Sequence, residues 1–324
     1  MDTNQLLLSL SLGLNKQRDG LSLTNYVLRN ALPKLVGDAK VSLFEVFVNE
    51  KDEESDASLT FKNVDYRDER VDQRLDVEEL KTFAFDSNGS FFAGVQELGD
   101  KVAIPIKSDL GPLRLLFICP FTKDALIRSA VFQFMELYLN QANLVDQMER
   151  DQLTKLLNRK SFDTYYDYIL SSTETKAEMD VWLGVLDIDH FKRVNDTYGH
   201  LYGDEVLLHF SQLIERNFRY SDIPFRFGGE EFVVLLETDK ADFAKSALNR
   251  FRVVVEGYDF PGVGQVTVSI GFMKCERNTL PTTLIDQADQ ALYYAKENGR
   301  NQVVYYEDIA ESKSSVEEGD IDLF

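Results

Sequence analysis

The sequence predicts an α+β protein of two domains connected by a helix. At 324 residues the chain is longer than one hydrophobic core usually supports. Strand and helix patterns mix on both sides of a strongly helical stretch. We therefore expect a first domain at 1–122, a connecting helix at 123–150, a second domain at 151–308 and an acidic, disordered tail at 309–324.

The composition limits the classes of molecule that the protein is expected to bind. Hydrophobic residues make up 44% of the chain, charged residues 28%, and the net charge is −20. Such a charge repels nucleic-acid polymers and anionic membranes, but a nucleotide held by local cations and a divalent metal remains possible. The sequence has no apolar run near the ~20 residues of a membrane span, no signal-peptide pattern and no close cysteine motif. We expect a cytoplasmic protein.

The first domain combines a helical start with several strands. Leu28, Leu32 and Leu35 fall on one helical face, and an acidic loop is expected at 50–56. Strands are expected at 41–48, 101–106 and 113–119, with a turn at 109–112 before the last. This order resembles a GAF domain, and a PAS-like domain is the alternative. All three histidines lie in the second domain, so the first cannot bind haem or metal through histidine.

The connecting helix has a heptad pattern. Apolar residues alternate steps of four and three, interrupted by Gln141, which predicts the seam of a parallel two-stranded coiled coil between two copies. The alternative is a helix that packs on its own domain. The seam positions are Ile127, Val131, Phe134, Tyr138, Gln141, Val145 and Met148.

The second domain has a β-α-β-β-α-β order, which is typical of ferredoxin-like and nucleotide-cyclase folds. Strands are expected at 181–188, 223–227, 232–236, 265–273 and 303–306. Helices are expected at 204–217, 240–257 and 284–298.

Two acidic segments in this domain suit a metal. Asp187-Ile188-Asp189 ends an apolar strand, where α/β sheets place ligands. Gly228-Gly229-Glu230-Glu231 lies between two strands, and its glycines permit a tight turn. Each segment by itself is more often a capped strand end or a solvated hairpin. Together, Asp187 and Glu230 would form a carboxylate site for Mg²⁺ and substrate phosphates.

Cations accompany these acids. Lys296 and Arg300 are four residues apart near a helix end, so they share a face. Such a pair often only complements the helix dipole, but it could also grip phosphates. Lys192 follows the Asp-x-Asp strand and could act in the same way.

At this point the sequence resembles the GGDEF family of bacterial signalling enzymes. The resemblance covers about half the chain and rests on separated motifs in the family's order. They are DQLTKLLNR at 151–159, DIDHFKRVNDTYGH at 187–200, Gly203-Asp204, GGEEF at 228–232 and AKENGRN at 295–301. Phe227 stands where a tyrosine is frequent in the family, and Tyr202 precedes Gly203-Asp204; neither supplies a catalytic group.

The resemblance implies a diguanylate cyclase, which condenses two GTP into cyclic di-GMP with Mg²⁺ or Mn²⁺, two ions in each site. It implies that Asp187, the Ile188 carbonyl and Glu230 bind metal, and that Glu230 and Lys192 are catalytic. The implied substrate-binding residues are Asn195, His200, Asp204, Gly228, Gly229, Lys296 and Arg300. A receptor that binds GTP or cyclic di-GMP without catalysis is the alternative function.

The resemblance has two further implications. Each site holds one GTP and the product needs two, so we expect a homodimer whose sensor domain sets the encounter of the sites. Arg219-Tyr220-Ser221-Asp222 resembles the family's RxxD inhibitory site, and Arg250 falls on a facing helix. Arg219, Asp222 and Arg250 are therefore expected to bind the product, cyclic di-GMP. An isolated RxxD string is otherwise a common surface ion pair.

Overall fold

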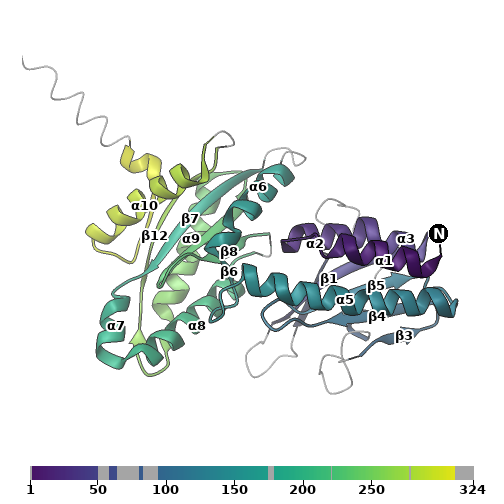
Figure 1. Cartoon of the computed structure of the whole chain (residues 1–324). Coiled ribbons are helices and arrows are strands. Elements are labelled where there is room, and N and C mark those ends of the chain that lie inside the picture. The colour runs from purple at the N-terminus through teal and green to yellow at the C-terminus, as the bar shows by residue number, and fades with distance from the viewer. Residues whose placement is uncertain are drawn as a thin grey trace, which may run out of the picture. The chain divides into compact units, whose positions relative to one another are not determined.

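The computed structural model forms two compact units, Met1–Arg150 and Asp151–Phe324 (Figure 1). It describes residues 2–49, 58–63, 80–82, 94–173, 179–219, 221–276 and 279–310. The expected loop at 50–56 and nearly all of the expected tail lie outside these residues. Both units are mixed α+β.

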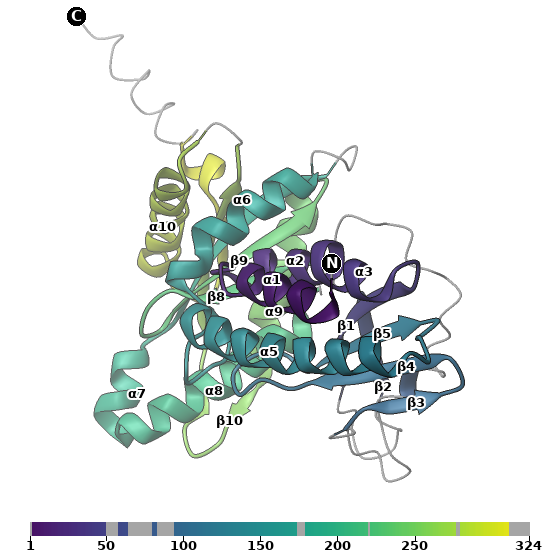
Figure 2. The same ribbon diagram turned by 45° about the vertical axis from the view of Figure 1, so that its right-hand side comes forward.

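Unit 1 is a five-stranded antiparallel sheet in the order β2-β1-β5-β4-β3. Its strands are β1 (Lys40–Asn49), β2 (Ser58–Asn63), β3 (Gln96–Leu98), β4 (Lys101–Ile106) and β5 (Arg114–Cys119). Its helices are α1 (Thr3–Leu14), α2 (Gly20–Tyr26), the π-helical η1 (Val27–Ala31), α3 (Leu32–Val36) and α5 (Ala125–Glu149). The helices gather on one face of the sheet (Figures 1 and 2). The three predicted strands and the buried leucine face are confirmed.

Helix α5 corrects the coiled-coil interpretation. The helix itself is confirmed, and Asp124 caps its first turn by accepting from the Leu126 and Ile127 amides. Most of the predicted seam, however, lies in the core of its own unit, with α1, α2 and α3, whereas Met148 at its end is 61% exposed. Gln141 donates its amide to the Gln17 carbonyl at 3.0 Å. The seam side chains buried in this core are Val131, Phe134, Tyr138 and Val145. These positions cannot also face a partner helix, as the alternative of a self-packed helix anticipated.

The last turns of α5 bury two carboxylates. Asp146 accepts from Ser108 Oγ and lies 3.4 Å from Arg114 Nη1; burial opposes its ionisation, but Arg114 and its other donors lower its pKa. Glu149 accepts from the Gly20 amide at 3.1 Å, but burial prevails and raises its pKa to about 7. The two acids therefore respond differently to pH.

Unit 2 has a six-stranded sheet in the order β13-β12-β7-β9-β8-β6. The inner order β12-β7-β9-β8 is antiparallel throughout, as the ferredoxin-like prediction requires. The strands are β6 (Leu157–Asn158), β7 (Asp180–Ile188), β8 (Ile223–Arg226), β9 (Glu231–Thr238), β12 (Val268–Lys274) and β13 (Val303–Tyr305), beside a small ribbon of β10 (Asp259–Phe260) and β11 (Gly264–Gln265).

Helices cover both faces of this sheet. Helices α7 (Phe191–Tyr198), α8 (His200–Asn217) and α9 (Ala241–Gly257) pack on one face, and α6 (Phe162–Thr173) and α10 (Pro281–Glu297) pack on the other. Gly271 of β12 lets α10 approach, because a Cβ there would lie 2.2 Å from the Ala288 carbonyl oxygen and the Leu292 nitrogen. The predicted strands and helices are present, whereas α6 and α7 were not predicted.

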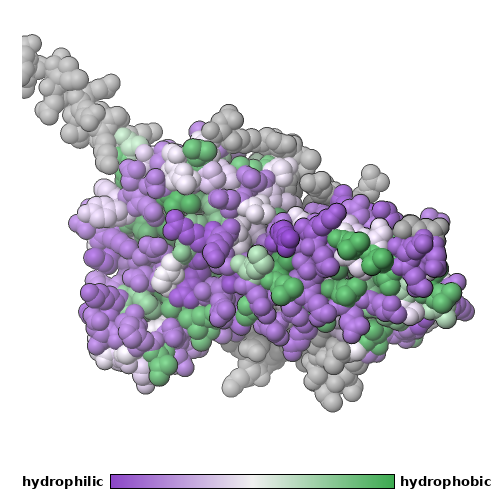
Figure 3. Space-filling view, viewed as in Figure 1, coloured by the Kyte–Doolittle hydropathy of each residue, from purple (hydrophilic) through white to green (hydrophobic). Residues whose placement is uncertain are grey.

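The surface is mainly hydrophilic on the face shown in Figure 3, where hydrophobic residues gather over α1 and α5. Of the helices within the described residues, none combines the length and apolar character that a bilayer crossing requires.

Candidate active site

The ends of two paired strands bring the predicted metal residues together. Asp187 lies opposite Glu231 in the register of β7 and β9, and the Ile188 amide is 3.4 Å from the Glu230 carbonyl oxygen. The Gly228-Gly229 turn delivers Glu230 to this position. Asp187 and Ile188 thus meet Glu230 at one end of the paired strands, although Glu230 is more than 40 residues away in the sequence.

A lysine already contacts this cluster. Lys296 Nζ, in the last turn of α10, lies 2.8 Å from Asp187 Oδ2. Asp187 is 6% exposed, and burial raises its pKa to about 6. The ion pair with Lys296 opposes this rise, while Glu230 and Glu231 reinforce it. The site is therefore an acidic edge that needs a cation.

The donor set fits a hard divalent cation. Two carboxylates and a backbone carbonyl are oxygen ligands, and Mg²⁺ commonly takes one or two carboxylates plus substrate phosphates. No cluster of three or more His, Cys, Asp or Glu side chains placed to hold a metal occurs among the described residues. Mg²⁺ held by so few protein ligands would complete its coordination shell with water and substrate oxygens. The contact between Lys296 and Asp187 also shows that the carboxylate accepts a cation.

Asp189 has a different task from Asp187. It is 4% exposed, and its carboxylate accepts from Thr267 Oγ1 and Ser269 Oγ, both at 2.7 Å, and from the Asn301 amide at 3.1 Å. These donors occupy the carboxylate. Asp189 therefore ties β7 to the loop after α10 instead of facing a ligand, a role that the sequence did not reveal.

That loop holds the second predicted cation in an uncommon conformation. Gly299, Arg300 and Asn301 have φ values of 107°, 63° and 47°, all in the left-handed region that residues with a Cβ rarely adopt. The Arg300 amide donates to the Ala295 carbonyl at 3.0 Å. Asp189 and this bond hold Arg300, half-buried, close to the end of α10 that carries Lys296.

The residues expected to read a base lie on α7 and α8. Asn195 packs so closely on Gly203 that a Cβ at 203 would lie 2.0 Å from Asn195 Oδ1. Asp204 is the next residue of α8 and is exposed. A short left-handed turn at Gly199, with φ 90°, separates the helices and starts α8 at His200.

The remaining predicted residues of the site are accessible. His200 and Lys192 are both exposed, Lys192 in the first turn of α7. Gly229 is exposed and Gly228 half-buried, in the turn before β9. The backbone carbonyls of both glycines accept hydrogen bonds, whereas the side chains of Lys192 and His200 form none with another described residue. The roles of these four residues stay predictions.

Arg226 is a site residue that the sequence reasoning missed. Its guanidinium donates to the carbonyl oxygens of Gly228 (3.1 Å) and Gly229 (2.9 Å) and to Asp151 Oδ1 (2.8 Å). Asp151 also accepts from the amide and hydroxyl of Thr154, both at 2.8 Å. The first residue of unit 2 is thereby bonded to the glycine turn. An arginine two residues before a Gly-Gly pair was the available signal.

The predicted inhibitory residues lie in one region but differ in exposure and in hydrogen bonding. Arg219 is exposed, while Asp222 is 8% exposed and accepts from the Arg219 amide at 2.7 Å. Burial raises the pKa of Asp222 to about 6. Arg250 donates to the Asn217 carbonyl at 2.9 Å, two residues before Arg219. Tyr220 lies outside the described residues.

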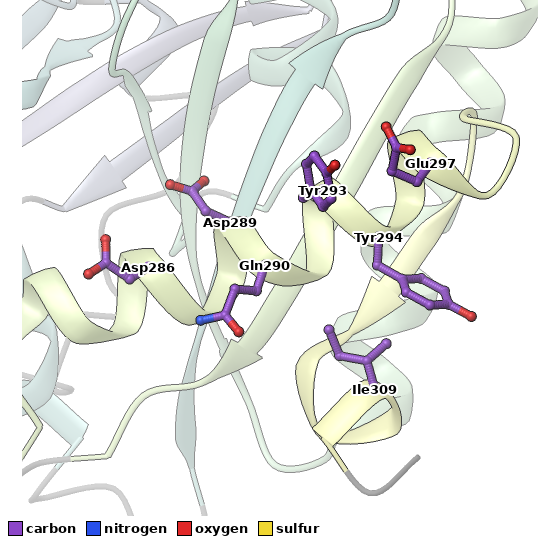
Figure 4. A pocket seen from close by; sticks show the side chains of 7 residues that line it. All are labelled: Asp286, Asp289, Gln290, Tyr293, Tyr294, Glu297 and Ile309. Carbon is purple, nitrogen blue, oxygen red and sulfur yellow. The ribbon is translucent and has the colours of Figure 1, made fainter. Parts of the chain in front are cut away.

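A separate groove of about 650 Å³ follows α10 and contains none of the predicted site residues. Asp286, Asp289, Tyr293 and Glu297 come from α10, while Ile309 comes from the helical turn at 306–310 (Figure 4). Asp289 is electrostatically coupled to Glu231, and burial is the main cause of its raised pKa. The groove is thus an acidic neighbour of the active site.

Comparison with known proteins identifies a related family. Residues 148–302 match the family model described as "Diguanylate cyclase, GGDEF domain". The chain is 35% identical over 215 residues to diguanylate cyclase DgcM of Escherichia coli, which covers 65% of this chain and 50% of the relative. It is 39% identical over 161 residues to response regulator PleD of Caulobacter vibrioides, covering 48% of this chain and 35% of the relative.

A solved structure is also similar. The GGDEF domain of DgcB from Caulobacter crescentus, determined in complex with c-di-GMP, is 35% identical, with a TM-score of 0.46 over 49% of this chain and 96% of that chain. The chain spans half or less of the length of the curated relatives described above. Over residues 148–302, the chain therefore contains a domain of the GGDEF family.

Proposed function

We propose that this protein is a diguanylate cyclase that joins two GTP molecules into cyclic di-GMP and releases two pyrophosphates. The meeting of Asp187 and Glu230 at the ends of β7 and β9 is the observation that carries the proposal. A carboxylate edge of this kind serves phosphoryl chemistry, in which most of the work is positioning and charge stabilisation. The intact Gly-Gly-Glu-Glu turn favours an enzyme over a receptor.

The reaction is a nucleotidyl transfer. The 3′-hydroxyl oxygen of one GTP attacks the α-phosphorus of the other, its proton passes to Glu230, and the bond to pyrophosphate breaks. A bound Mg²⁺, held by Asp187, Glu230 and the Ile188 carbonyl, would polarise the phosphate and offset its charge. Lys192, Lys296 and Arg300 would hold the phosphates and stabilise the leaving pyrophosphate.

Guanine specificity would come from Asn195 and Asp204. Guanine presents N1–H and N2–H₂ donors, which a carboxylate accepts, while an amide complements another edge. A base without these groups would leave buried polar atoms unpaired, and adenine would be rejected on that ground. The close contact of Asn195 with Gly203 supports a fixed position for the amide. His200 and the two glycines of the turn would complete the pocket.

The reaction requires two copies. Each site holds one GTP, so two GGDEF domains must face each other to form both phosphodiester bonds. We therefore propose a homodimer, in which unit 1 acts as a sensory domain, GAF-like in its order of elements, and sets how often the two sites meet.

Product inhibition is a further part of the proposal. Arg219 is exposed. Arg250 lies on α9, and its guanidinium donates to the Asn217 carbonyl. Two arginines can bind phosphate and the guanine Hoogsteen edge of cyclic di-GMP. Asp222 accepts the Arg219 amide, so its substitution would disturb the turn as well as the site. Arg219→Ala is the cleaner test.

The activity test compares the protein with Glu230→Gln. Purified protein, stripped of bound nucleotide, is incubated with GTP and Mg²⁺, and products are separated by chromatography. We expect cyclic di-GMP from the parent and a loss of at least about 100-fold in Glu230→Gln. Glu276→Gln, an exposed control in unit 2, should leave turnover unchanged. Nucleotide binding by the parent without any product would instead favour the receptor.

The inhibition test adds cyclic di-GMP to the parent and to Arg219→Ala during turnover. We expect the concentration for half-inhibition to rise at least about 10-fold in the variant, with unchanged initial rates at low product, because one charge-assisted contact is lost. Equal sensitivity of the two proteins would remove Arg219 from the inhibitory site.

A further inference from the structure

Helix α1 has a surface of an uncommon kind for this chain. Its sequence, TNQLLLSLSLGL, contains no Asp, Glu, Lys or Arg, although charged residues make up 28% of the whole protein. Leu8 is 63% exposed and Leu12 is 57% exposed. The two leucines are four residues apart and therefore lie on the same side of the helix.

Helix α5 repeats this feature. Leu126, Leu137 and Leu144 are 72%, 42% and 56% exposed. At 100° per residue, steps of eleven and seven place all three within about 20° around the helix. They lie along one exposed side of the helix, about a quarter turn from the side that packs in the core of unit 1.

Charge is nearly absent from the outward side of α5. Of its four ionisable acids and bases, Asp146 and Glu149 are buried. Arg128 pairs with Glu97 of β3, and only Glu136 is exposed and forms no ion pair with another described residue. A helix of 25 residues with a single such charge departs from the acidic surface that the net charge of −20 predicts.

The two helices lie side by side and present one surface. Helices α1 and α5 are in contact within unit 1 and are adjacent in both ribbon views (Figures 1 and 2). Hydrophobic residues gather over both of them in the space-filling view (Figure 3). Leu8, Leu12, Leu126, Leu137 and Leu144 define this surface, the α1–α5 face. Exposed apolar residues gathered on one face in this way are typical of an interaction site.

We propose that the α1–α5 face is the surface through which two copies of this chain associate. Two molecules that each carry −20 repel one another, so their contact must be made where charge is missing. A two-fold contact uses the same patch on both molecules and must be complementary to itself, which an uncharged leucine surface satisfies. This proposal rests on the proposed function, because the synthesis of cyclic di-GMP requires two facing sites and so gives the dimer a role.

The test measures association of the full chain. Sedimentation across a concentration series gives the dimer Kd of the parent and of Leu137→Glu/Leu144→Glu. We expect a parent dimer and a Kd raised at least about 10-fold for each substitution, because each buries a charge in place of a leucine. Leu98→Glu is the matched control: Leu98 is 61% exposed on β3 of the same unit, and its substitution should leave the Kd unchanged.

A second variant distinguishes loss of the dimer contact from misfolding of the protein. Leu137→Lys/Leu144→Lys should also be monomeric by itself, with circular dichroism and melting like those of the parent. An equimolar mixture of the Glu and Lys variants should dimerise again, because opposite charges then meet across the two-fold contact. A monomeric parent, an undiminished dimer in the Glu variant, or a mixture that stays monomeric would each overturn the proposal.

Turnover separates this proposal from the function on which it rests. If the face and the function are both correct, the Glu variant loses specific activity at low protein concentration and regains it at high concentration. If the Glu variant dissociates but the parent makes no cyclic di-GMP, the dimer face is supported and the cyclase function is contradicted. If a protein shown to be monomeric is fully active, the cyclase function is supported and the need for the dimer is contradicted.

Discussion

At the scale of single residues, Arg226 shows how a partly buried cation can support the turn that carries a predicted catalytic residue. Its planar guanidinium reaches two carbonyls of the Gly-Gly turn and the carboxylate of Asp151. Hydrogen bonds to charged groups contribute about 1.5–3 kcal/mol each. Arg226, the last residue of β8 in the same hairpin, thus ties the turn that carries Glu230 to Asp151 outside the hairpin, and we interpret it as a positioning residue.

We expect Arg226→Met to lower kcat about 10- to 100-fold, with the KM for GTP changed less than about 3-fold. The turn would lose its anchor while the phosphate and base contacts remain. Arg226→Lys should recover little, because an ammonium cannot present a planar fork to three acceptors. Steady-state kinetics measures both constants, and Arg18→Met, at an exposed arginine of unit 1, is the control. A rise in KM at constant kcat would contradict a positioning role.

Residue types and spacing were enough to predict the acidic edge, but not its supports. Asp187 and Glu230 carry recognisable chemistry at strand ends, and the structure brings them together. Asp189 and Arg226 act through partners 112 and 75 residues away in the chain, Asn301 and Asp151. No local pattern encodes such pairs, because only the folded sheet makes them neighbours. Both Asp residues of the Asp-x-Asp motif looked alike in sequence, and burial assigned them different tasks.

At the scale of elements, α5 shows what periodicity predicts and what it leaves undecided. The heptad pattern predicted the helix and its apolar side correctly. The same pattern fits a partner helix and the core of the helix's own domain, and the core occupies it here. The exposed leucines lie about a quarter turn away from the predicted seam. Helix α7 was not predicted because its eight residues bury only Phe191 and Val194, too few for a period.

Glu149, at the end of α5, should make the stability of unit 1 depend on pH. The native state keeps the proton up to about pH 7, whereas the unfolded state releases it near the ordinary glutamate pKa of 4.5. The unfolded state thus binds fewer protons between these values, and stability falls as pH rises through this window. The full shift corresponds to roughly 3 kcal/mol, an upper limit.

Glu149→Gln removes this titration while keeping an acceptor for the Gly20 amide. We expect the melting temperature of unit 1 to exceed that of the parent by several degrees at pH 8 and to match it at pH 4.5. Calorimetry of the full chain across pH measures the difference. Glu136→Gln, on the exposed side of the same helix, should show no such pH-dependent gain. A constant gap between parent and Glu149→Gln at all pH values would contradict the burial argument.

At the scale of the whole molecule, net charge and self-association oppose each other. Each copy carries −20, so bringing two copies together costs electrostatic energy that the α1–α5 face must exceed by apolar burial. Salt screens this repulsion, since the Debye length is ~10 Å at 0.1 M and shorter at higher ionic strength. An apolar contact does not weaken under the same change.

We therefore expect the dimer to tighten with salt. Raising NaCl from about 50 to 300 mM should lower the dimer Kd several-fold, measured by sedimentation at constant pH and temperature. Repeating the series with Leu98→Glu, which adds a charge outside the face, should give the same direction. Weakening by salt would instead indicate that ion pairs join the two copies.

The position of the Arg226 contacts has a consequence for how proteins of this type can change over evolution. All three acceptors of Arg226 belong to unit 2, as do Asp187, Glu230, Lys296 and the loop that Asp189 holds. The described contacts that shape the catalytic edge thus involve only residues from Asp151 onward. Recombination that replaces the sequence before Asp151 would leave these contacts in place, so new input domains can be joined to an unchanged catalytic unit.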